Sequence, residues 1–595
     1  FLTRGQTVLL SFRAFLGGNT SFSVLANGIK ERKLRTADYH VFAQDDWKIT
    51  PRLTLNLGLR YELDLPPYDT LGRLSAFDAS LYRPPPSPSD LPAGGIVQAG
   101  NAINAYDLSE VPNVDRRVLH SIDPNNFAPR FGFAFKPFKS GRFVVRGGCG
   151  VYYSRPSFQS LVGSIYSPPF YFVGINGPGN LTAPFAPVPA ENEFPTLAAG
   201  PLGLSGVTFD RNNRTPYIQQ YQVSTQLALT PNTLLEVAYV GTRGVKLLRR
   251  VAINQARLAS PENPVFNPVT NTWISTNTPG NTQARAPFQG VSASGGPTGY
   301  NQDQTTGQSS YNSLQVTLSR RNSNGLQFLA AYTFGESIDN GSGIGGGSGR
   351  IGLLNPATIN DASSVVGNQL DNRADRGLSD FDRTHRLVTN VIWELPKPAF
   401  VRTRKVGRVL FSGWLVSGIV TVMSGLPIDV FDGSAGNLYF GPLSGNGRPN
   451  LVPGRSPASN IPPGYYFNPY AFARPIVLAG QVIPSSGGWA TASATGTDFG
   501  NAGRNILRGP RQFNVDLSMS KRFALGEARS IEMRAEFFNL FNTVNYANPA
   551  SNFGSASQID PVTGQIPPGQ AGNFGKIQST SNNPRLIQFA LKFNF

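Results

Sequence analysis

The feature that most constrains this chain is an alternation of apolar and polar residues within segments of about ten residues. The last segment shows it most clearly, because Ile587, Phe589, Leu591, Phe593 and Phe595 alternate with polar or small residues. Successive side chains of a strand point to opposite faces, so this period predicts strands with one apolar and one polar face. A tilted strand of about ten residues spans the apolar layer of an outer membrane. The pattern therefore favours an all-β protein whose strands cross a membrane.

The same alternation recurs along most of the chain and predicts about fifteen strands. Their expected spans are 6–16, 20–28, 38–47, 52–62, 127–135, 142–153, 217–229, 233–243, 311–321, 325–334, 384–394, 413–423, 512–522, 529–540 and 586–595. No stretch reaches the roughly 18 uncharged apolar residues that a membrane helix needs. The chain contains 64 glycines and 48 prolines, which favours many turns between short strands over long helices. Any membrane crossing is thus expected to be made by strands.

The connections between the expected strands alternate between short and mostly long. The long segments are 63–126, 154–216, 244–310, 335–383, 424–511 and 541–585, and only 395–412 is awkward as a short turn. Outer-membrane barrels have short periplasmic turns and longer extracellular loops. We therefore expect residues 1–595 to form one antiparallel transmembrane β-barrel unit with these loops outside the cell. In this orientation the first strand runs inward, which predicts at least one earlier strand and hence a partial barrel.

The charge and the cysteine content narrow the possible partners. The formal net charge is +17, but the basic residues are scattered, which favours membrane lipid and lipopolysaccharide over nucleic acid as a partner. A single cysteine, Cys149, excludes an intramolecular disulfide, a thiolate zinc cage and an iron–sulfur cluster. Cys149 has the same parity as Phe143, Val145 and Val151, so its side chain is expected to face lipid. We expect no cofactor.

Five short motifs make the chain similar to a known family. They are Tyr39–Trp47 followed by Leu53–Tyr61, Leu378–Arg386, Gly413–Ile419, Arg534–Asn542 and the terminal Phe595. With these motifs the chain resembles the TonB-dependent outer-membrane receptors, in particular the large Oar-like barrels. The resemblance implies the outer membrane of a Gram-negative bacterium and a 22-stranded barrel with an N-terminal plug. The expected strands would then be the C-terminal part of such a barrel, with the plug and the first strands missing.

The resemblance also implies partners and an assembly signal. The partners are the TonB complex, contacted through a missing N-terminal segment, the barrel-assembly machinery, and an unidentified solute such as a siderophore, a carbohydrate or a peptide. The terminal aromatic residues Phe589, Phe593 and Phe595 would be the signal that the assembly machinery reads.

The densest charged cluster lies at the foot of the expected loop 335–383. It contains Asp371, Asp375, Asp380 and Asp382, interleaved with Arg373, Arg376, Arg383 and Arg386. A calcium ion needs several oxygen ligands that converge on one point, and four neighbouring arginines oppose this. We therefore expect ion pairs that anchor the loop, with a calcium site as the less favoured alternative. His385 is expected to join this network, because His40 and His120 lack a metal-ligand spacing to it or to each other.

Other motifs favour structural roles over catalysis. Gly341–Gly346 matches a dinucleotide-binding pattern but lies in an expected loop, without the leading strand and following helix that the pattern needs. Asp45 and Asp46 are strand neighbours whose carboxylates diverge, so we expect hydrogen bonding near the turn instead of acid–base catalysis. Walker, His-Glu-x-x-His and Gly-x-Ser-x-Gly motifs do not occur in the sequence. We expect no enzyme and no catalytic or metal site.

The aromatic loop segments Tyr166–Phe172 and Tyr465–Tyr470 leave two interpretations open. Such surfaces suit the capture of a carbohydrate or a peptide, yet the same composition also folds loops over a barrel mouth. No residue can therefore be assigned to a ligand from the sequence.

The function expected from these observations is an outer-membrane receptor that captures a solute in its extracellular loops for TonB-energised import. One alternative is a surface binding or adhesion protein that uses the barrel only as an anchor, without transport. A weaker alternative is a soluble, β-rich secreted binding module, which would carry charged residues on both strand faces.

Overall fold

The computed structural model shows an all-β protein, as the alternation predicts. The residues that the structure describes are 5–8, 16–20, 22–28, 31–88, 90, 92, 94–100, 113–155, 170–176, 179–182, 206–293, 299–342, 367–396, 407, 411–433, 447–475, 482–485, 488–491, 499–525, 529–561 and 563–595. The 3₁₀ turns within these ranges are η1 (Ala79–Leu81), η3 (Pro279–Asn281), η4 (Gln283–Arg285), η9 (Pro469–Ala471) and η10 (Phe553–Ser555). Within the same ranges, none of the helices has the length and apolar character needed to cross a membrane.

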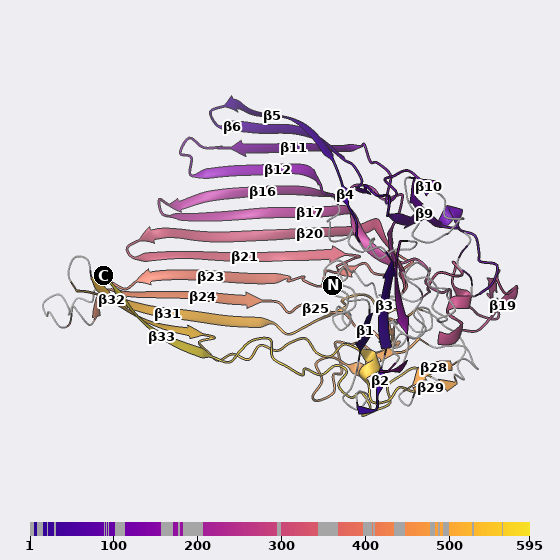
Figure 1. Cartoon of the computed structure of the whole chain (residues 1–595). Coiled ribbons are helices and arrows are strands. Elements are labelled where there is room, and N and C mark those ends of the chain that lie inside the picture. The colour runs from indigo at the N-terminus through magenta and orange to yellow at the C-terminus, as the bar shows by residue number, and fades with distance from the viewer. Residues whose placement is uncertain are drawn as a thin grey trace.

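Thirteen strands form one continuous antiparallel sheet, which we call the wall (Figure 1). In chain order they are β5 (Asp38–Thr50), β6 (Leu53–Asp64), β11 (Asn126–Phe135), β12 (Phe143–Tyr153), β16 (Tyr217–Thr230), β17 (Thr233–Ala252), β20 (Tyr300–Ser323), β21 (Leu326–Asp339), β23 (His385–Glu394), β24 (Trp414–Met423), β31 (Gln512–Ala524), β32 (Ser530–Phe538) and β33 (Leu586–Asn594). Each strand pairs with the next wall strand along the chain. This up-and-down order is the one that the alternation of short and long connections predicts.

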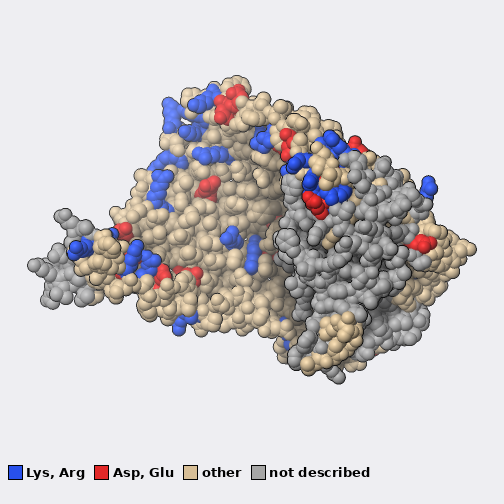
Figure 2. All heavy atoms as spheres, viewed as in Figure 1, with Lys and Arg blue, Asp and Glu red and all other residues tan. Residues whose placement is uncertain are grey.

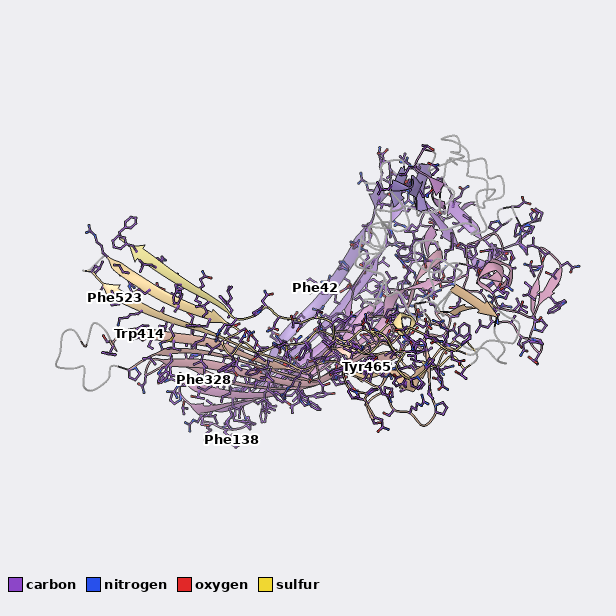
Figure 3. All side chains as sticks on the ribbon, turned by 90° about the horizontal axis from the view of Figure 1, so that it is seen from below. Phe42, Phe138, Phe328, Trp414, Tyr465 and Phe523 are labelled. Atoms are coloured by element: carbon purple, nitrogen blue, oxygen red, sulfur yellow. The ribbon has the colours of Figure 1, made fainter. Side chains whose placement is uncertain are left out.

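The wall is curved, and within the described residues it has two edges. Figure 3 shows the sheet bent into a trough, and β5 and β33 are the two edge strands. Side chains on both edges are strongly exposed, for example Phe42 at 73% and Phe589 at 78%. A membrane-spanning sheet must pair its edges, because unsatisfied backbone groups are costly in hydrocarbon. The wall therefore has the geometry of a barrel segment.

The register of the wall separates the alternating residues onto two faces. Cross-strand partners lie on the same face of a sheet, and Leu591 lies opposite Met533 whereas Lys592 lies opposite Glu532. On the same face of the wall, nearer to β5, Phe131 lies opposite Cys149. We call the face of Leu591, Met533 and Phe131 the apolar face and the opposite one the polar face. The apolar face matches the lipid-facing row that the sequence predicts.

On the apolar face, aromatic rings cover glycines of the neighbouring strand. Phe133 lies opposite Gly147, and Tyr221 lies opposite Gly241. A Cβ atom on Gly147 would lie 2.4 Å from the Phe133 ring, and one on Gly241 would lie 2.0 Å from the Tyr221 ring. A side chain at either position would therefore force the ring beside it to move.

The first two expected strands, 6–16 and 20–28, do not join the wall, so this prediction was wrong. Instead, β1 (Gly5–Val8) and β3 (Phe22–Gly28) form a separate three-stranded sheet with β13 (Tyr171–Asn176). Residues 9–15 lie outside the described residues. Alternation with period two marks any half-exposed strand and carries no information about the sheet that the strand joins.

Three wall strands extend at least five residues beyond their expected spans. β17 continues to Ala252, β20 begins at Tyr300 and β21 continues to Asp339, so the expected loops 244–310 and 335–383 begin or end inside strands. Two short strands, β15 (Gly206–Phe209) and β22 (Gly377–Leu378), pair with these extensions. The sequence underestimated the strands because backbone pairing continues into polar residues, where the apolar alternation ends.

The long connections pack together at one end of the wall into a body that we call the loop assembly (Figure 1). One hydrophobic core in it contains Phe467, Phe472, Phe553 and Phe574, each at most 2% exposed. A second core contains Leu74, Val97, Val118, Leu119 and Phe209. Because each core draws on more than one expected loop, the loops stabilise one another as a small globular protein does.

The remaining strands of the loop assembly are short. They are β2 (Asn19–Thr20), β4 (Leu34–Arg35), β7 (Tyr68–Asp69), β8 (Ser75–Phe77), β9 (Ile96–Ala99), β10 (Asn113–Val114), β14 (Gly179–Asn180), β18 (Val265–Asn267), β19 (Thr272–Ile274), β25 (Pro427–Ile428), β26 (Asn450–Leu451), β27 (Phe472–Ala473), β28 (Val482–Ser485), β29 (Gly488–Thr491) and β30 (Leu507–Arg508). The basic side chains visible in Figure 2 are spread over the wall and the loop assembly and do not form one patch, as the scattered charges of the sequence predict.

Candidate functional site

A groove of about 440 Å³ lies across six neighbouring wall strands, from β5 to β17. Most of the residues that line it belong to the polar face. These are Gln44, Asn56, Gly58, Arg130, Gly132, Gly148, Tyr152, Gln220, Gln222, Val240 and Thr242. The groove therefore offers four amide groups, a guanidinium, a phenol and a hydroxyl to a solute inside the wall.

Glycines keep the centre of this groove open. Gly132 lies opposite Gly148, and Gly58 lies on one side of Arg130 with Gly150 on the other. Without side chains at these positions, the polar groups of β5, β6, β16 and β17 stand at the rim and the backbone forms the floor. Glycine in a strand interior weakens the strand and often marks a site where another molecule approaches the backbone closely.

Arg130 is the cation at the centre of the groove. The carbon of its guanidinium lies 4.6 Å from the centre of the Tyr152 ring. Its Cγ atom would be only 3.2 Å from a Cβ atom on Gly150, so the side chain extends across this glycine toward Tyr152. Its side chain makes no ion pair with any carboxylate in the described part of the chain. The N–H groups of Arg130 are thus available to an anionic or carbonyl oxygen of a solute.

The residues that line the groove carry no ligand-binding motif that marks them in the sequence. A usable signal was present, because polar or small residues occupy the alternate positions of Asn126–Phe135 and Gln220–Gln226. These positions lie about 90 residues apart in the sequence, and only the register of β11, β12 and β16 brings them together.

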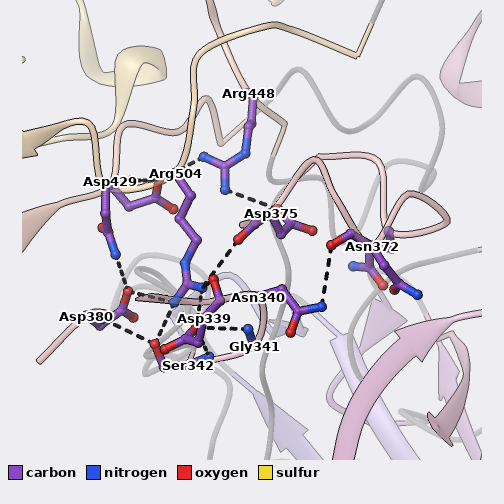
Figure 4. Close-up of polar contacts among 12 residues, drawn as sticks. Asp339, Asn340, Gly341, Ser342, Asn372, Asp375, Asp380, Asp429, Arg448 and Arg504 are labelled. Carbon is purple, nitrogen blue, oxygen red and sulfur yellow. Dashed lines mark hydrogen bonds and ion pairs between the residues drawn. The ribbon is translucent and has the colours of Figure 1, made fainter. Parts of the chain in front are cut away.

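Of the four aspartates in the predicted cluster, Asp375, Asp380 and Asp382 form ion pairs in the loop assembly (Figure 4). Asp371 is exposed and accepts a hydrogen bond from the backbone of Arg373. Asp375 accepts hydrogen bonds from Arg249 at 3.0 Å and from Arg448 at 3.3 Å. Arg448 also donates to Asp429 at 2.8 Å. The side chains of Arg249, Asp375 and Arg448 are at most 5% exposed. One carboxylate thus connects two arginines that are about 200 residues apart in the chain.

A second arginine centre lies beside the first one. Arg504 donates to Asp339 at 2.6 Å and to Asp380 at 3.0 Å, and Arg508 donates to Asp382 at 2.7 Å. The predicted loop-anchoring ion pairs are therefore confirmed. The arginine partners come from other loops and not from the interleaved positions Arg373 to Arg386. Sequence proximity favoured those positions, whereas the packing of the loops decided the pairing.

Burial has an electrostatic consequence at Asp375. Burial raises the pKa of the Asp375 carboxyl to about 6, although Arg448 and Arg249 each act to lower it. The carboxylate remains ionised at neutral pH, where it neutralises part of the charge of the two buried arginines. In mildly acidic solution it takes up a proton, which the folded loop assembly binds more tightly than the unfolded chain does.

The aromatic loop segments fold the loops, as one of the two open interpretations proposed. The Phe467 ring lies 5.1 Å from the Phe574 ring, and the Tyr466 hydroxyl donates to the carbonyl of Arg508. Phe170 is fully buried, and Tyr171 is 5% exposed. Residues 166–169 lie outside the described residues. The described aromatic residues of both segments therefore contribute mainly to the interior of the loop assembly.

Two further predictions are confirmed by the wall register. Asp45 lies opposite Leu57 and Asp46 lies opposite Asn56, so the two carboxylates point to different faces. Asp46 accepts a hydrogen bond from the Asn56 side chain, which is the structural role that was expected. Cys149 is exposed and lies opposite Phe131 on the apolar face.

His385 does not join the ion-pair network, so this prediction was wrong. Its Nδ1 atom lies 2.8 Å from the Tyr332 hydroxyl oxygen, and its ring stacks on the Tyr332 ring. His385 is the first residue of β23 and lies opposite Phe334 on the apolar face. The parity of the strand therefore outweighs its closeness in sequence to Asp382 and Arg383.

The other predicted site residues are placed only in part. Gly341 and Ser342 donate backbone hydrogen bonds to Asp339 and belong to the ion-pair region, while 343–346 lie outside the described residues. Phe589 and Phe593 lie on the apolar face, and Phe595 is 94% exposed. Their role as an assembly signal stays a prediction.

The family of the chain is shown by a comparison with models of known protein families. A model of the outer membrane beta barrel domain family matches residues 2–588. The chain belongs to this family. This protein is therefore an outer-membrane β-barrel protein, which confirms the predicted barrel class and the bacterial outer membrane as its location. No curated protein matches the chain.

Solved structures of outer-membrane receptors and transporters are similar to this barrel protein. The outer-membrane transporter YddB from Escherichia coli has a TM-score of 0.39 and 9% identity, over 97% of this chain and 50% of that one. The receptor FpvA from Pseudomonas aeruginosa, solved with bound pyoverdines, has a TM-score of 0.37 and 10% identity, over 97% and 39%. The ferric enterobactin receptor PfeA of the same species has 0.36 and 8%, over 97% and 50%. The chain thus spans half or less of their length.

Proposed function

We propose that this outer-membrane barrel is a receptor for the import of a polar solute, with TonB as the source of energy. The loop assembly captures the solute outside the cell, and the groove around Arg130 binds it on its way along the polar face. The observation that carries the proposal is the groove itself, because a membrane anchor needs no open, amide-lined site inside the wall. No chemical step on the solute is part of this proposal.

Two features support a capturing role for the loop assembly. Its hydrophobic cores and its buried arginines hold loops from distant parts of the chain in one arrangement. Such preorganisation lowers the entropy that binding would otherwise cost. The Arg130 guanidinium and the surrounding amides favour a solute that is rich in oxygen and carries a carboxylate or a comparable anionic group.

The test is uptake by whole cells that carry or lack the gene, offered ferric siderophores, oligosaccharides and peptides together. Depletion of each compound from the medium is measured by mass spectrometry, in cells with and without a functional TonB system. We expect one class of compound to be depleted only when both the gene and TonB are present. Binding to the cell surface without depletion would instead support the adhesion alternative.

A matched pair of variants tests the groove. Arg130→Gln removes its cation, whereas Arg146→Gln removes a cation from the same polar face outside the groove. We expect uptake to fall at least tenfold in Arg130→Gln at equal surface levels and to stay close to the parent in Arg146→Gln. Equal uptake by both variants would contradict the assignment of the groove.

A further inference from the structure

A second constellation on the polar face lies where β5 and β6 reach the loop assembly. Asp38 lies directly opposite Asp64, and His40 is two residues further along β5, so all three side chains share one face. One ligand atom from each residue lies within 4.8 Å of the ligand atoms of the other two. Nε2 of His40 is 3.8 Å from Oδ1 of Asp64. This arrangement is compact enough for three ligands to reach one ion.

The carboxylates gathered at this constellation favour the binding of a cation. Two carboxylates directly opposite each other on neighbouring strands repel, and the side chain of Asp64 is only 10% exposed. A third carboxylate, Glu62, lies opposite His40 but is paired with Arg60 at 2.6 Å. Arg155 pairs with Asp38 at 2.8 Å and lies near enough to Asp64 for its charge to act on it, and the His40 imidazole is a further neighbour of Asp64.

The donor set selects a class of ion. Calcium and magnesium prefer six or more oxygen ligands, whereas an imidazole nitrogen favours transition cations such as zinc, iron or copper. Two carboxylates and one imidazole leave open positions for water or for a group of a bound solute, as in three-ligand zinc sites. The two carboxylates together supply a charge of −2, which suits a divalent ion.

We propose that Asp38, His40 and Asp64 bind a divalent transition cation of the zinc class, and that Arg155 covers Asp38 when the ion is absent. Binding of the ion moves the Arg155 guanidinium away from Asp38, because both cations compete for the same carboxylate. The ion then joins the start of β5 to the end of β6 at the mouth of the wall. This site is separate from the groove, and the proposal that it binds a cation does not depend on the proposed solute import.

The test uses the full chain in vesicles of phosphatidylcholine, with Zn²⁺ as the probe and a chromogenic indicator as competitor. We expect one Zn²⁺ per chain, an affinity at least tenfold lower in His40→Ala and in the isosteric Asp64→Asn, and a higher affinity in Arg155→Gln. His120→Ala and His385→Ala are the matched controls, since the chain has three histidines. Binding that is absent in the parent, or unchanged in both site variants, would overturn the proposal.

A second readout does not depend on the affinity measurement. Diethyl pyrocarbonate modifies accessible imidazoles, and mass spectrometry distinguishes the peptides that contain His40, His120 and His385. We expect Zn²⁺ to protect His40 alone from modification. Protection of all three histidines, or of none, would show that the ion binds elsewhere or not at all. Migration of each variant on an unheated gel shows whether the protein resists unfolding by the detergent and is therefore folded.

Discussion

The wall and the loop assembly differ in where their large apolar side chains lie. In the wall, large apolar residues such as Leu591 at 73% exposed and Phe589 at 78% exposed stay on the surface. In the loop assembly, Phe467, Phe472 and Phe574 are at most 2% exposed. The wall relies on lipid as its apolar surroundings, whereas the loops build their own hydrophobic core in water.

Charged groups follow the same division. In the loop assembly, arginines such as Arg249 and Arg504 are buried against aspartates from other loops. On the polar face of the wall, Arg130 contacts an aromatic ring instead of a carboxylate. Buried ion pairs specify one arrangement of the loops, while a cation without a carboxylate partner can bind a passing solute. Buried, paired cations and exposed cations without a carboxylate partner thus belong to different regions.

The largest effect that distinguishes the two regions is expected from Phe574→Ala. The Phe574 ring contacts the rings of Phe467, Phe472 and Phe553, so its removal leaves a cavity in the core of the loop assembly. We expect a loss of about 3 to 5 kcal/mol in the stability of the loop assembly. Protease resistance of the loops in vesicle-inserted protein measures it.

The control for this prediction is Phe266→Ala, which removes a loop phenylalanine that is 43% exposed. The wall should stay assembled in both variants, as shown by migration on an unheated gel. Loss of the wall in Phe574→Ala would show that the two regions fold as one unit.

The next effect concerns the apolar face of the wall. Leu591→Arg places a charge on this face, and we expect a cost of about 2 to 4 kcal/mol near the midplane of the membrane. Lys592→Leu is the matched change on the polar face and should cost less. Unfolding by denaturant in lipid vesicles measures both variants. If Leu591→Arg unfolds like the parent while Lys592→Leu does not, the assignment of the two faces is reversed.

A smaller effect is expected from the pH dependence of Asp375. Its pKa in the folded protein is about 6, above its ordinary value, so the folded state binds the proton more tightly than the unfolded state. The contribution of this group to stability is therefore complete below about pH 4 and is lost as the pH rises through 6, by up to about 3 kcal/mol. Denaturant unfolding of the loop assembly between pH 4 and pH 7 measures it.

Asp375→Asn should remove this component of the pH dependence, while Asp371→Asn, at an exposed position of the same loop, should retain it. A parent protein whose loop assembly gains stability relative to Asp375→Asn between pH 4 and pH 7 would contradict the sign of the shift.

The smallest expected effect on stability comes from using the single cysteine to test which face of the wall meets lipid. Cys149 lies on the apolar face, so we expect a water-soluble maleimide to leave it unlabelled in intact membranes and to label it after unfolding. In a Cys149→Ser background, Gln222→Cys places the thiol in the groove on the polar face, where labelling should occur in intact membranes. The opposite pattern would exchange the two faces.

The sequence by itself determined the wall and its two faces. Alternation over about ten residues is a local property, and in segments such as Leu53–Asp64 and Leu586–Asn594 it fixes both the strand and its lipid-facing side chains. Chain order then determines the pairing, because short turns make neighbouring strands antiparallel partners.

Only the tertiary structure decided which residues meet across the loops. Asp375 pairs with Arg249 and Arg448 instead of Arg373 or Arg376, and β1 and β3 pair with β13 instead of the wall. Asp38, His40 and Asp64 also meet only through the register of β5 and β6. These contacts depend on how segments that are far apart in the chain pack into one core. Such packing leaves no periodic pattern in the sequence, so the sequence alone does not show which residues meet.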